Sequence, residues 1–259
     1  MLRHTFAFAL LPLALLTLVS TDAGACCSQR TFVASTGNDA NPCTVVAPCR
    51  SFAAALGQTE SHGEIIVLDS AGYGPVTIPN PISITAPPGI YAGITVVSGD
   101  GITVVTGSSS KVVLRGLTIN GEGGQNGINF VSGQGLQIHD CVVSDMAANG
   151  IQLEAPGSTV LVTGTLVRQS LQSGIYLQGT QVAVLDGVRA EGNRYGVYAR
   201  SGPSVTIRNS VVVNSFSGGG FNLEASSADS TMTISNSVSS SNSGHGVAAS
   251  GNVSSAAPK

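Results

Sequence analysis

The residues whose types could do chemistry form two rows at a regular spacing in the second half of the chain. The first row consists of Asn129, Gln152, Tyr176, Tyr198 and Asn222. The second row, two positions further on, consists of Val131, Glu154, Gln178, Arg200 and Glu224. Sugars bind through hydroxyl hydrogen bonds and through stacking on aromatic rings, so the nine residues other than Val131 predict a glycan-binding surface, which we call the polar strip. The alternative is an ordinary solvated sheet face with cross-strand pairs such as Tyr176 and Tyr198.

Catalytic and metal-binding patterns are harder to find. His139 and Asp140 stand beside Cys141, but Asp140 occupies a position where other repeats carry a bend residue, which favours a structural role. Glu154 and Glu224 share an outward column, yet they lie three coils apart, about 14 Å at ~4.8 Å per coil, so they cannot share an ion. No phosphate-binding loop, Ser-His-Asp arrangement or zinc motif is present. We therefore predict no metal site and no cofactor, and we assign no catalytic residue.

The elements that position these residues are repeats. Six glycines recur 23, 24, 22, 24 and 26 residues apart, namely Gly127, Gly150, Gly174, Gly196, Gly220 and Gly246. Each repeat holds three short alternating segments and no helical periodicity, which predicts one coil of a parallel β-solenoid. Leucine-rich and nonapeptide calcium repeats need motifs that are missing, and hexapeptide helices have a shorter coil. The prediction is an all-β, right-handed parallel β-helix with three-strand coils of about 22–26 residues.

Two further columns support this fold. Because side chains alternate along a strand, the apolar pairs after each glycine should point inward. These pairs are Ile128/Phe130, Ile151/Leu153, Ile175/Leu177, Val197/Ala199 and Phe221/Leu223. A second column holds only residue types that tolerate a left-handed bend, with asparagines able to hydrogen-bond from coil to coil. Its members are Gly116, Asp140, Gly164, Asp186, Asn209 and Asn236.

The N-terminus predicts export. An apolar run from Phe6 to Val19 precedes Ala23-Gly24-Ala25, which is typical of a cleaved signal peptide over residues 1–25. A retained anchor, or a lipoprotein modified at Cys26, is the alternative; in either case we expect a secreted or periplasmic protein. Export permits disulfides, and Cys43 and Cys49 close a small loop with a proline before each cysteine. We predict a bridge there, with two free thiols as the alternative.

The remaining segments complete the domain organisation. Residues 26–60 should hold an N-terminal strand, the disulfide loop and a short cap helix from Arg50 to Leu56 that covers the open end of the solenoid. The β-helix should span 61–250, and 251–259 should be a disordered tail. Charged residues are only 10% and the net charge is −3 without a polybasic run, which excludes nucleic acid as a partner. No segment after the signal peptide could span a membrane.

Several blocks resemble a known group. Residues 31–42, residues 47–52 and Gly72-Tyr73-Gly74-Pro75-Val76-Thr77-Ile78 are similar to secreted bacterial right-handed β-helix proteins of the pectate-lyase-like superfamily, over roughly residues 31–249. The resemblance implies export and contact with polysaccharide. It does not imply one activity, because the superfamily includes lyases, hydrolases, epimerases and adhesins.

The activities of that superfamily need groups that this sequence lacks. Its uronate lyases hold Ca²⁺ on clustered acids beside an Arg or Lys base, and no such cluster is visible. Gly244-His245-Gly246 matches a polygalacturonase motif whose Asn-Thr-Asp, Asp-Asp and Arg-Ile-Lys companions are absent. We therefore expect an exported, non-catalytic β-helix that binds polysaccharide or a cell-surface partner. The alternative is a polysaccharide lyase, hydrolase or epimerase.

Overall fold

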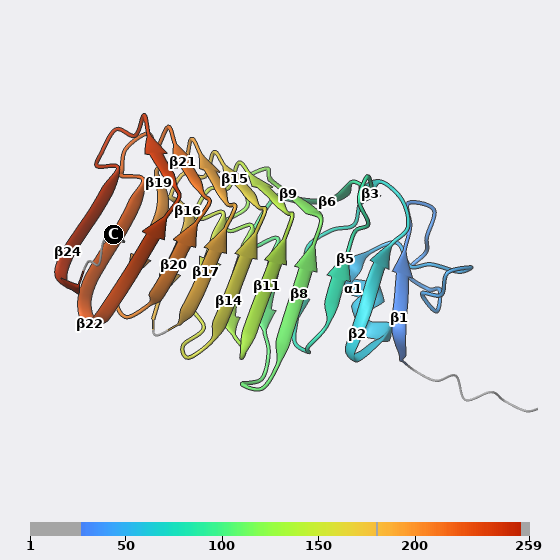
Figure 1. Cartoon of the computed structure of the whole chain (residues 1–259). Coiled ribbons are helices and arrows are strands. Elements are labelled where there is room, and N and C mark those ends of the chain that lie inside the picture. The colour runs from blue at the N-terminus through green and yellow to red at the C-terminus, as the bar shows by residue number, and fades with distance from the viewer. Residues whose placement is uncertain (1–26, 180, 255–259) are drawn as a thin grey trace, which may run out of the picture.

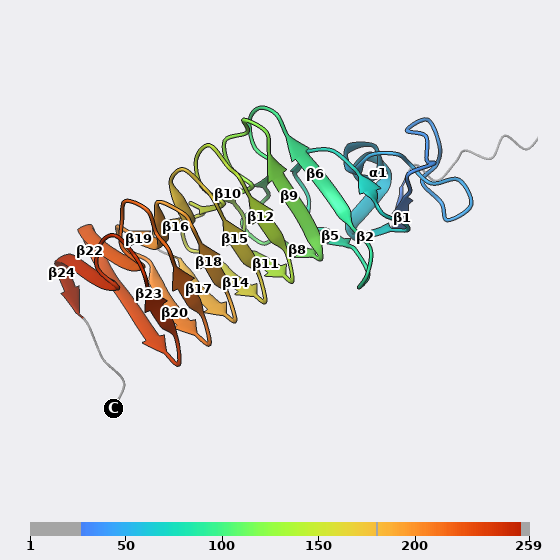
Figure 2. The same cartoon turned by 90° about the horizontal axis from the view of Figure 1, so that it is seen from above.

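The computed structural model describes residues 27–179 and 181–254, and these form one elongated parallel solenoid (Figure 1). Each regular coil contributes one strand to each of three sheets, and every strand pair is parallel (Figure 2). The predicted signal peptide, Cys26 and residues 255–259 of the predicted tail lie outside the described residues. The predicted all-β fold of three-strand coils is confirmed.

The three sheets run the length of the solenoid. Sheet 1 consists of β1 (Ser28–Val33), β2 (Thr59–Val67), β5 (Ser83–Thr85), β8 (Lys111–Arg115), β11 (Gly135–His139), β14 (Thr159–Thr163), β17 (Val182–Asp186), β20 (Ser204–Arg208) and the second half of β22 (Phe221–Ser235). Sheet 2 consists of β4 (Val76–Ile78), β7 (Ile102–Val105), β10 (Ile128–Ser132), β13 (Ile151–Leu153), β16 (Ser173–Gln178), β19 (Tyr195–Arg200), the first half of β22, and β24 (Val247–Ser254). Sheet 3 consists of β3 (Ala71–Gly72), β6 (Ala92–Val96), β9 (Leu117–Gly121), β12 (Val142–Ser144), β15 (Leu166–Arg168), β18 (Arg189–Glu191), β21 (Val211–Val213) and β23 (Val238–Ser240).

The core is a stack of identical positions from successive coils. In sheet 2, Ile128 pairs with Ile151, which pairs with Ile175, and the column continues through Val197 to Phe221. All of the predicted inward pairs are buried, with at most 5% of any side chain exposed. Each such aliphatic or aromatic side chain contributes about 1.5–3 kcal/mol when it is removed from water. Because side chains alternate along each strand, the positions between these buried residues point outward, and they hold the polar side chains.

The repeat glycines are needed because successive coils approach each other closely where the strands of sheet 2 begin. A Cβ atom on Gly196 would lie 2.6 Å from the carbonyl oxygen of Gly220 and 2.0 Å from Cγ1 of Val212. Gly150 shows the same conflict, with 2.7 Å to the carbonyl oxygen of Gly174. The column also begins one coil earlier than the sequence analysis placed it, at Gly101, whose Cβ would lie 2.7 Å from the carbonyl oxygen of Gly127.

The predicted bend column is correct in five coils and wrong in one. Gly116, Asp140, Gly164, Asn209 and Asn236 all have φ between 46° and 71°. In the remaining coil the left-handed residue is Gly187, with φ of 64°, rather than Asp186. Asp186 ends strand β17 opposite Thr163 and Arg208, because glycine adopts the left-handed backbone more easily than the aspartate beside it.

The asparagine ladder predicted at this corner is present. Nδ2 of Asn236 donates to Oδ1 of Asn209 at 2.6 Å, and Nδ2 of Asn209 donates to Oδ1 of Asp186 at 2.8 Å. Asp186 thus keeps a ladder role through its side chain although its backbone is extended. Three successive coils are linked by these side chains.

The N-terminal end is closed by helix α1 (Phe52–Gln58), which starts two residues later than expected and lies against β1, β2 and β4 (Figure 1). The side chain of Ser51 accepts a hydrogen bond from the backbone N–H of Ala54 and so caps the helix. Phe52 and Ala55 point into the core.

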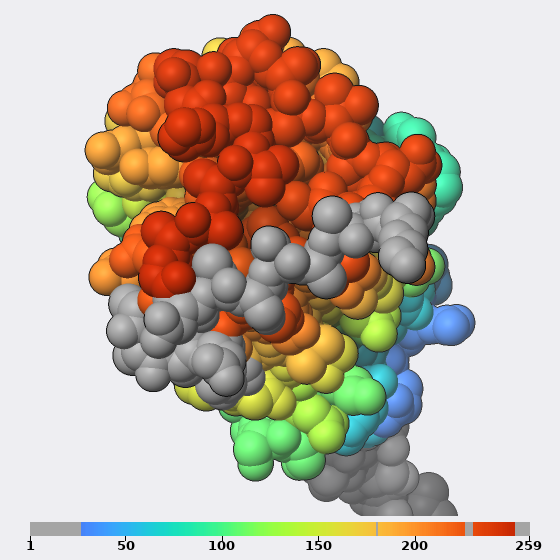
Figure 3. All heavy atoms as spheres, turned by 60° about the vertical axis from the view of Figure 1, so that its left-hand side comes forward, coloured from blue at the N-terminus to red at the C-terminus, as the bar shows by residue number. Residues whose placement is uncertain are grey.

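The two remaining predictions about the ends of the chain have different outcomes. Cys43 and Cys49 form the predicted disulfide, with Cα atoms 4.6 Å apart. At the other end β24 runs to Ser254, so the first residues of the expected tail continue a strand that pairs with β22. Figure 3 shows the last coils at this end of the solenoid, with earlier coils behind them.

Candidate functional site

The structure brings the two rows of the polar strip together on the outer face of sheet 2. In the first row, Asn129 pairs with Gln152, and the register continues through Tyr176 and Tyr198 to Asn222. In the second row, Gln178 pairs with Arg200, which pairs with Glu224, while Glu154 directly follows β13. The first-row side chains are half-buried, whereas Gln178 and Arg200 are exposed. The strip is therefore a continuous surface over five coils.

The aromatic centre of the strip contains a third ring that the sequence analysis missed. Tyr176 and Tyr198 meet edge to face, with ring centroids 5.8 Å apart and an interplanar angle of 64°. Tyr195 stacks on Tyr198 at 5.1 Å and 25°. Its ring fits over Gly218, where a Cβ would lie 2.1 Å from it. The three rings thus form a packed cluster, and those of Tyr176 and Tyr198 are not parallel to each other.

A recognisable signal for Tyr195 exists in the sequence. The position before each repeat glycine holds Asn126, Asn149, Ser173, Gly219 and His245 in the other five coils. Tyr195 is the one phenol in this column, and it lies three residues before Tyr198 in the same strand, β19.

Hydrogen bonds and an ion pair hold the aromatic centre. The Tyr198 hydroxyl donates to Oε2 of Glu224, and Nε of Arg200 lies 3.5 Å from Oε1 of the same carboxylate. The Tyr176 hydroxyl donates to Oε1 of Gln178 at 2.5 Å. Burial raises the pKa of Tyr198 to about 12, and the bond to Glu224 adds to this shift. Burial also raises the pKa of Tyr176, so both phenols are neutral donors at physiological pH.

The N-terminal end of the strip is fixed by a carboxylate that the sequence analysis also missed. Oδ2 of Asp100 accepts from Nδ2 of Asn129 at 2.7 Å, and Oδ1 accepts from Nδ2 of Asn126 at 2.8 Å. Asp100 precedes Gly101 as Asn126 precedes Gly127, so extending the glycine column by one coil would have marked it. Further along, Nδ2 of Asn149 donates to Oε1 of Gln152 at 2.9 Å, so this part of the first row is held in place.

The surroundings of His139 and Asp140 indicate a structural role for both residues. Nδ1 of His139 lies 2.7 Å from Oγ1 of Thr163, one coil further on. Burial, together with the charge of Arg115, lowers the pKa of His139. Asp140 occupies the bend column with φ of 52°, as its role there requires.

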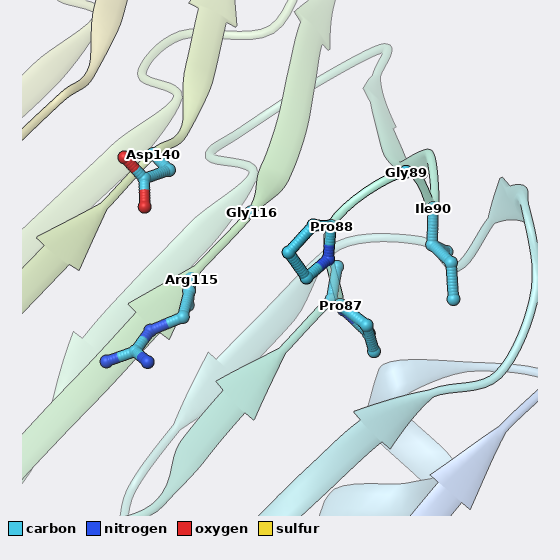
Figure 4. A pocket seen from close by; sticks show the side chains of 8 residues that line it. Pro87, Pro88, Gly89, Ile90, Arg115, Gly116 and Asp140 are labelled. Carbon is cyan, nitrogen blue, oxygen red and sulfur yellow. The ribbon is translucent and has the colours of Figure 1, made fainter.

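A cavity of about 340 Å³ lies beside this corner (Figure 4). It is lined by Ala86, Pro87, Pro88, Gly89, Ile90, Arg115, Gly116 and Asp140. The side chains of Arg115 and Asp140 extend away from the two prolines, so polar groups do not converge in the hollow (Figure 4). The polar strip has the richer set of hydrogen-bonding groups, and we take it as the candidate site.

Among the residues that the structure describes, no three His, Cys, Asp or Glu side chains are grouped so that they could hold a metal ion. Within the same residues, no helix has the length and apolar character needed to cross a membrane.

Comparisons with known proteins identify the fold. The sequence matches the family described as right handed beta helix region over residues 92–257. No curated protein matches the chain in sequence. Among solved structures, the crystal structure of pectate lyase Pel9A is similar with a TM-score of 0.70 and 18% identity, over 82% of this chain and 63% of that one. A rhamnogalacturonan lyase is similar with a TM-score of 0.50 and 12% identity, over 80% of this chain and 74% of that one.

At sequence identities this low, the similarity establishes a shared fold but not a shared activity. The chain spans only 63% of the pectate lyase, so that enzyme also contains parts without a counterpart here. The family match, in contrast, covers more than half of the chain and includes every repeat glycine that the sequence analysis found. Together with the three parallel sheets, it shows that the chain belongs to the right-handed β-helix family, with a pectate-lyase-like fold.

Proposed function

We propose that this protein is an exported β-helix that binds polysaccharide through the polar strip and does not cleave it. The observation that carries the proposal is the aromatic centre: Tyr176 and Tyr198 face outward on adjacent coils, beside Gln178, Arg200 and Glu224. Aromatic rings flanked by amide, guanidinium and carboxylate groups supply both the stacking and the hydrogen bonds that sugar rings need.

The proposed location is outside the cytoplasm, secreted or periplasmic. The Cys43–Cys49 disulfide supports it, because such bonds persist in oxidising compartments. The leader over residues 1–25 supports it independently. Anchoring through a lipid on Cys26 is the alternative.

The test is a glycan array followed by affinity measurements on each hit. Replacing Tyr176 and Tyr198 together by Ala should weaken binding by about 1 kcal/mol per ring, roughly five-fold for each. Tyr91→Ala is the matched control, because Tyr91 is a tyrosine 51% exposed and outside the strip. Unchanged affinity in the double variant would place the binding site elsewhere, and the absence of any hit would contradict glycan binding.

The alternative function is polysaccharide cleavage, which the two lyases among the structural neighbours favour. A uronate lyase needs groups that neutralise the substrate carboxylate, commonly a cation on clustered acids, and a nearby base. On the strip, Glu154 and Glu224 come from coils three apart. We expect no unsaturated product and no new reducing ends from a panel of polyuronates, with or without Ca²⁺. Reproducible calcium-dependent product would make the enzyme the better proposal.

A further inference from the structure

The charges around the aromatic centre of the strip do not favour an anionic ligand. Three charged side chains of the strip lie around Tyr176: Glu154 follows β13 on the preceding coil, and Arg200 and Glu224 lie on the next two coils. Arg200 is 3.5 Å from Glu224, so its charge is already compensated. Among the described residues, none forms an ion pair with Glu154. Two carboxylates against one guanidinium leave one negative charge beside the rings.

The nearest additional charges do not reverse this balance. The guanidinium of Arg194 lies over the ring of Tyr195, 5.7 Å from its centroid, and donates to Oε1 of Gln172 at 3.1 Å. It therefore faces the outer ring of the cluster rather than the hydroxyls of Tyr176 and Tyr198. At the other end of the strip, Asp100 adds a further carboxylate beside Asn129.

We infer that the polar strip selects neutral polysaccharides and discriminates against polyuronates. This inference rests on the proposed function of the strip, since it names the class of glycan that the strip accepts. A neutral chain offers only hydroxyl groups, which donate to the carboxylate of Glu154 and to amide oxygens such as that of Gln152. A uronate stacked on these rings would bring its carboxylate toward Glu154 or toward Glu224, without a free cation to receive it. A pair of like charges about 6 Å apart in water weakens binding about three-fold.

The experiment compares neutral polysaccharides (a soluble β-glucan, a galactan and a mannan) with polygalacturonate and alginate by calorimetry. The unmodified protein should bind at least one neutral polymer about three-fold or more tightly than either polyuronate. Its affinity for the neutral polymer should change little between about 0.05 M and about 0.5 M NaCl, because no ionic contact is screened. Equal or tighter binding of a polyuronate would overturn the inference while leaving glycan binding intact. Binding of neither class would overturn the proposed function itself.

A charge-reversing variant tests the cause. Glu154→Gln with Glu224→Gln keeps side-chain acceptors but changes the charge of the set from one negative to one positive. Polyuronate affinity should rise about ten-fold in this variant, and that gain should disappear at high salt. Glu191→Gln is the matched control, because Glu191 is also an ion-paired glutamate, at 2.9 Å from Arg189, but lies on sheet 3. No gain in the double variant, or an equal gain in the control, would overturn the electrostatic explanation.

Discussion

The column of repeat glycines makes a sharp prediction about stability at Gly196. In Gly196→Ala, the new Cβ would lie 2.6 Å from the carbonyl oxygen of Gly220 and 2.0 Å from Cγ1 of Val212. Carbon atoms in contact prefer 3.5–4.0 Å, so one neighbour must move by more than an ångström. The carbonyl oxygen of Gly220 accepts from the backbone N–H of Val197 at 2.9 Å, so moving it strains a bond that links two coils. Val212 is buried in the core and has little room to shift.

The magnitude follows from these contacts. Overpacking a well-packed interior costs about 1–3 kcal/mol, and weakening one backbone hydrogen bond adds about 1 kcal/mol. We therefore expect Gly196→Ala to lower the free energy of unfolding by about 3 kcal/mol. The assay is urea denaturation followed by circular dichroism, with the change in midpoint converted through a common m-value.

Two other glycines provide controls for the same substitution. At Gly246, in the last coil of the same column, the nearest atom to a new Cβ is Oγ of Ser239 at 3.5 Å, so Gly246→Ala should be nearly neutral. At Gly57, in helix α1, nothing lies within 4 Å, so Gly57→Ala should stabilise by about 0.5–1 kcal/mol. Equal effects at Gly196 and Gly246 would refute the close-approach explanation of the column.

Three further predictions concern the bend column, the disulfide and Tyr198. Asn209 has φ of 51°, so Asn209→Val should cost about 2 kcal/mol and Asn209→Gly about 1 kcal/mol or less; equal urea midpoints would contradict a left-handed backbone there. Replacing Cys43 and Cys49 by Ser should cost about 2–3 kcal/mol, and peptide mapping that finds both thiols free in exported protein would contradict the bridge. The pKa of Tyr198 is raised to about 12 from an ordinary value near 10, so its contribution to stability is complete below pH 10 and is lost as pH rises to about 12. The free energy of unfolding of Tyr198→Phe should therefore fall less than that of the parent protein over that pH range. Parallel curves of unfolding free energy against pH would contradict the raised pKa.

Much of the fold can be predicted from the sequence because its signals are local and repeated. Alternation along each strand decides which side chains point inward, and the glycine period decides which residues become neighbours on adjacent coils. The pairing of Tyr176 with Tyr198, and of Arg200 with Glu224, follows from that register. The disulfide is similarly local, since Cys43 and Cys49 are six residues apart.

Side-chain contacts that depart from the repeated columns were decided only by the tertiary structure. The left-handed backbone at Gly187 rather than Asp186 depends on where strand β17 ends against its neighbours. The stacking of Tyr195 on Tyr198 depends on free space over Gly218, and the bond from Asn129 to Asp100 depends on how the coil of Gly127 stacks on that of Gly101. Strand positions are determined by a periodic pattern that the sequence displays directly. Where a residue departs from its column, as Tyr195 does, the period does not predict its partner, which is determined by how successive coils stack.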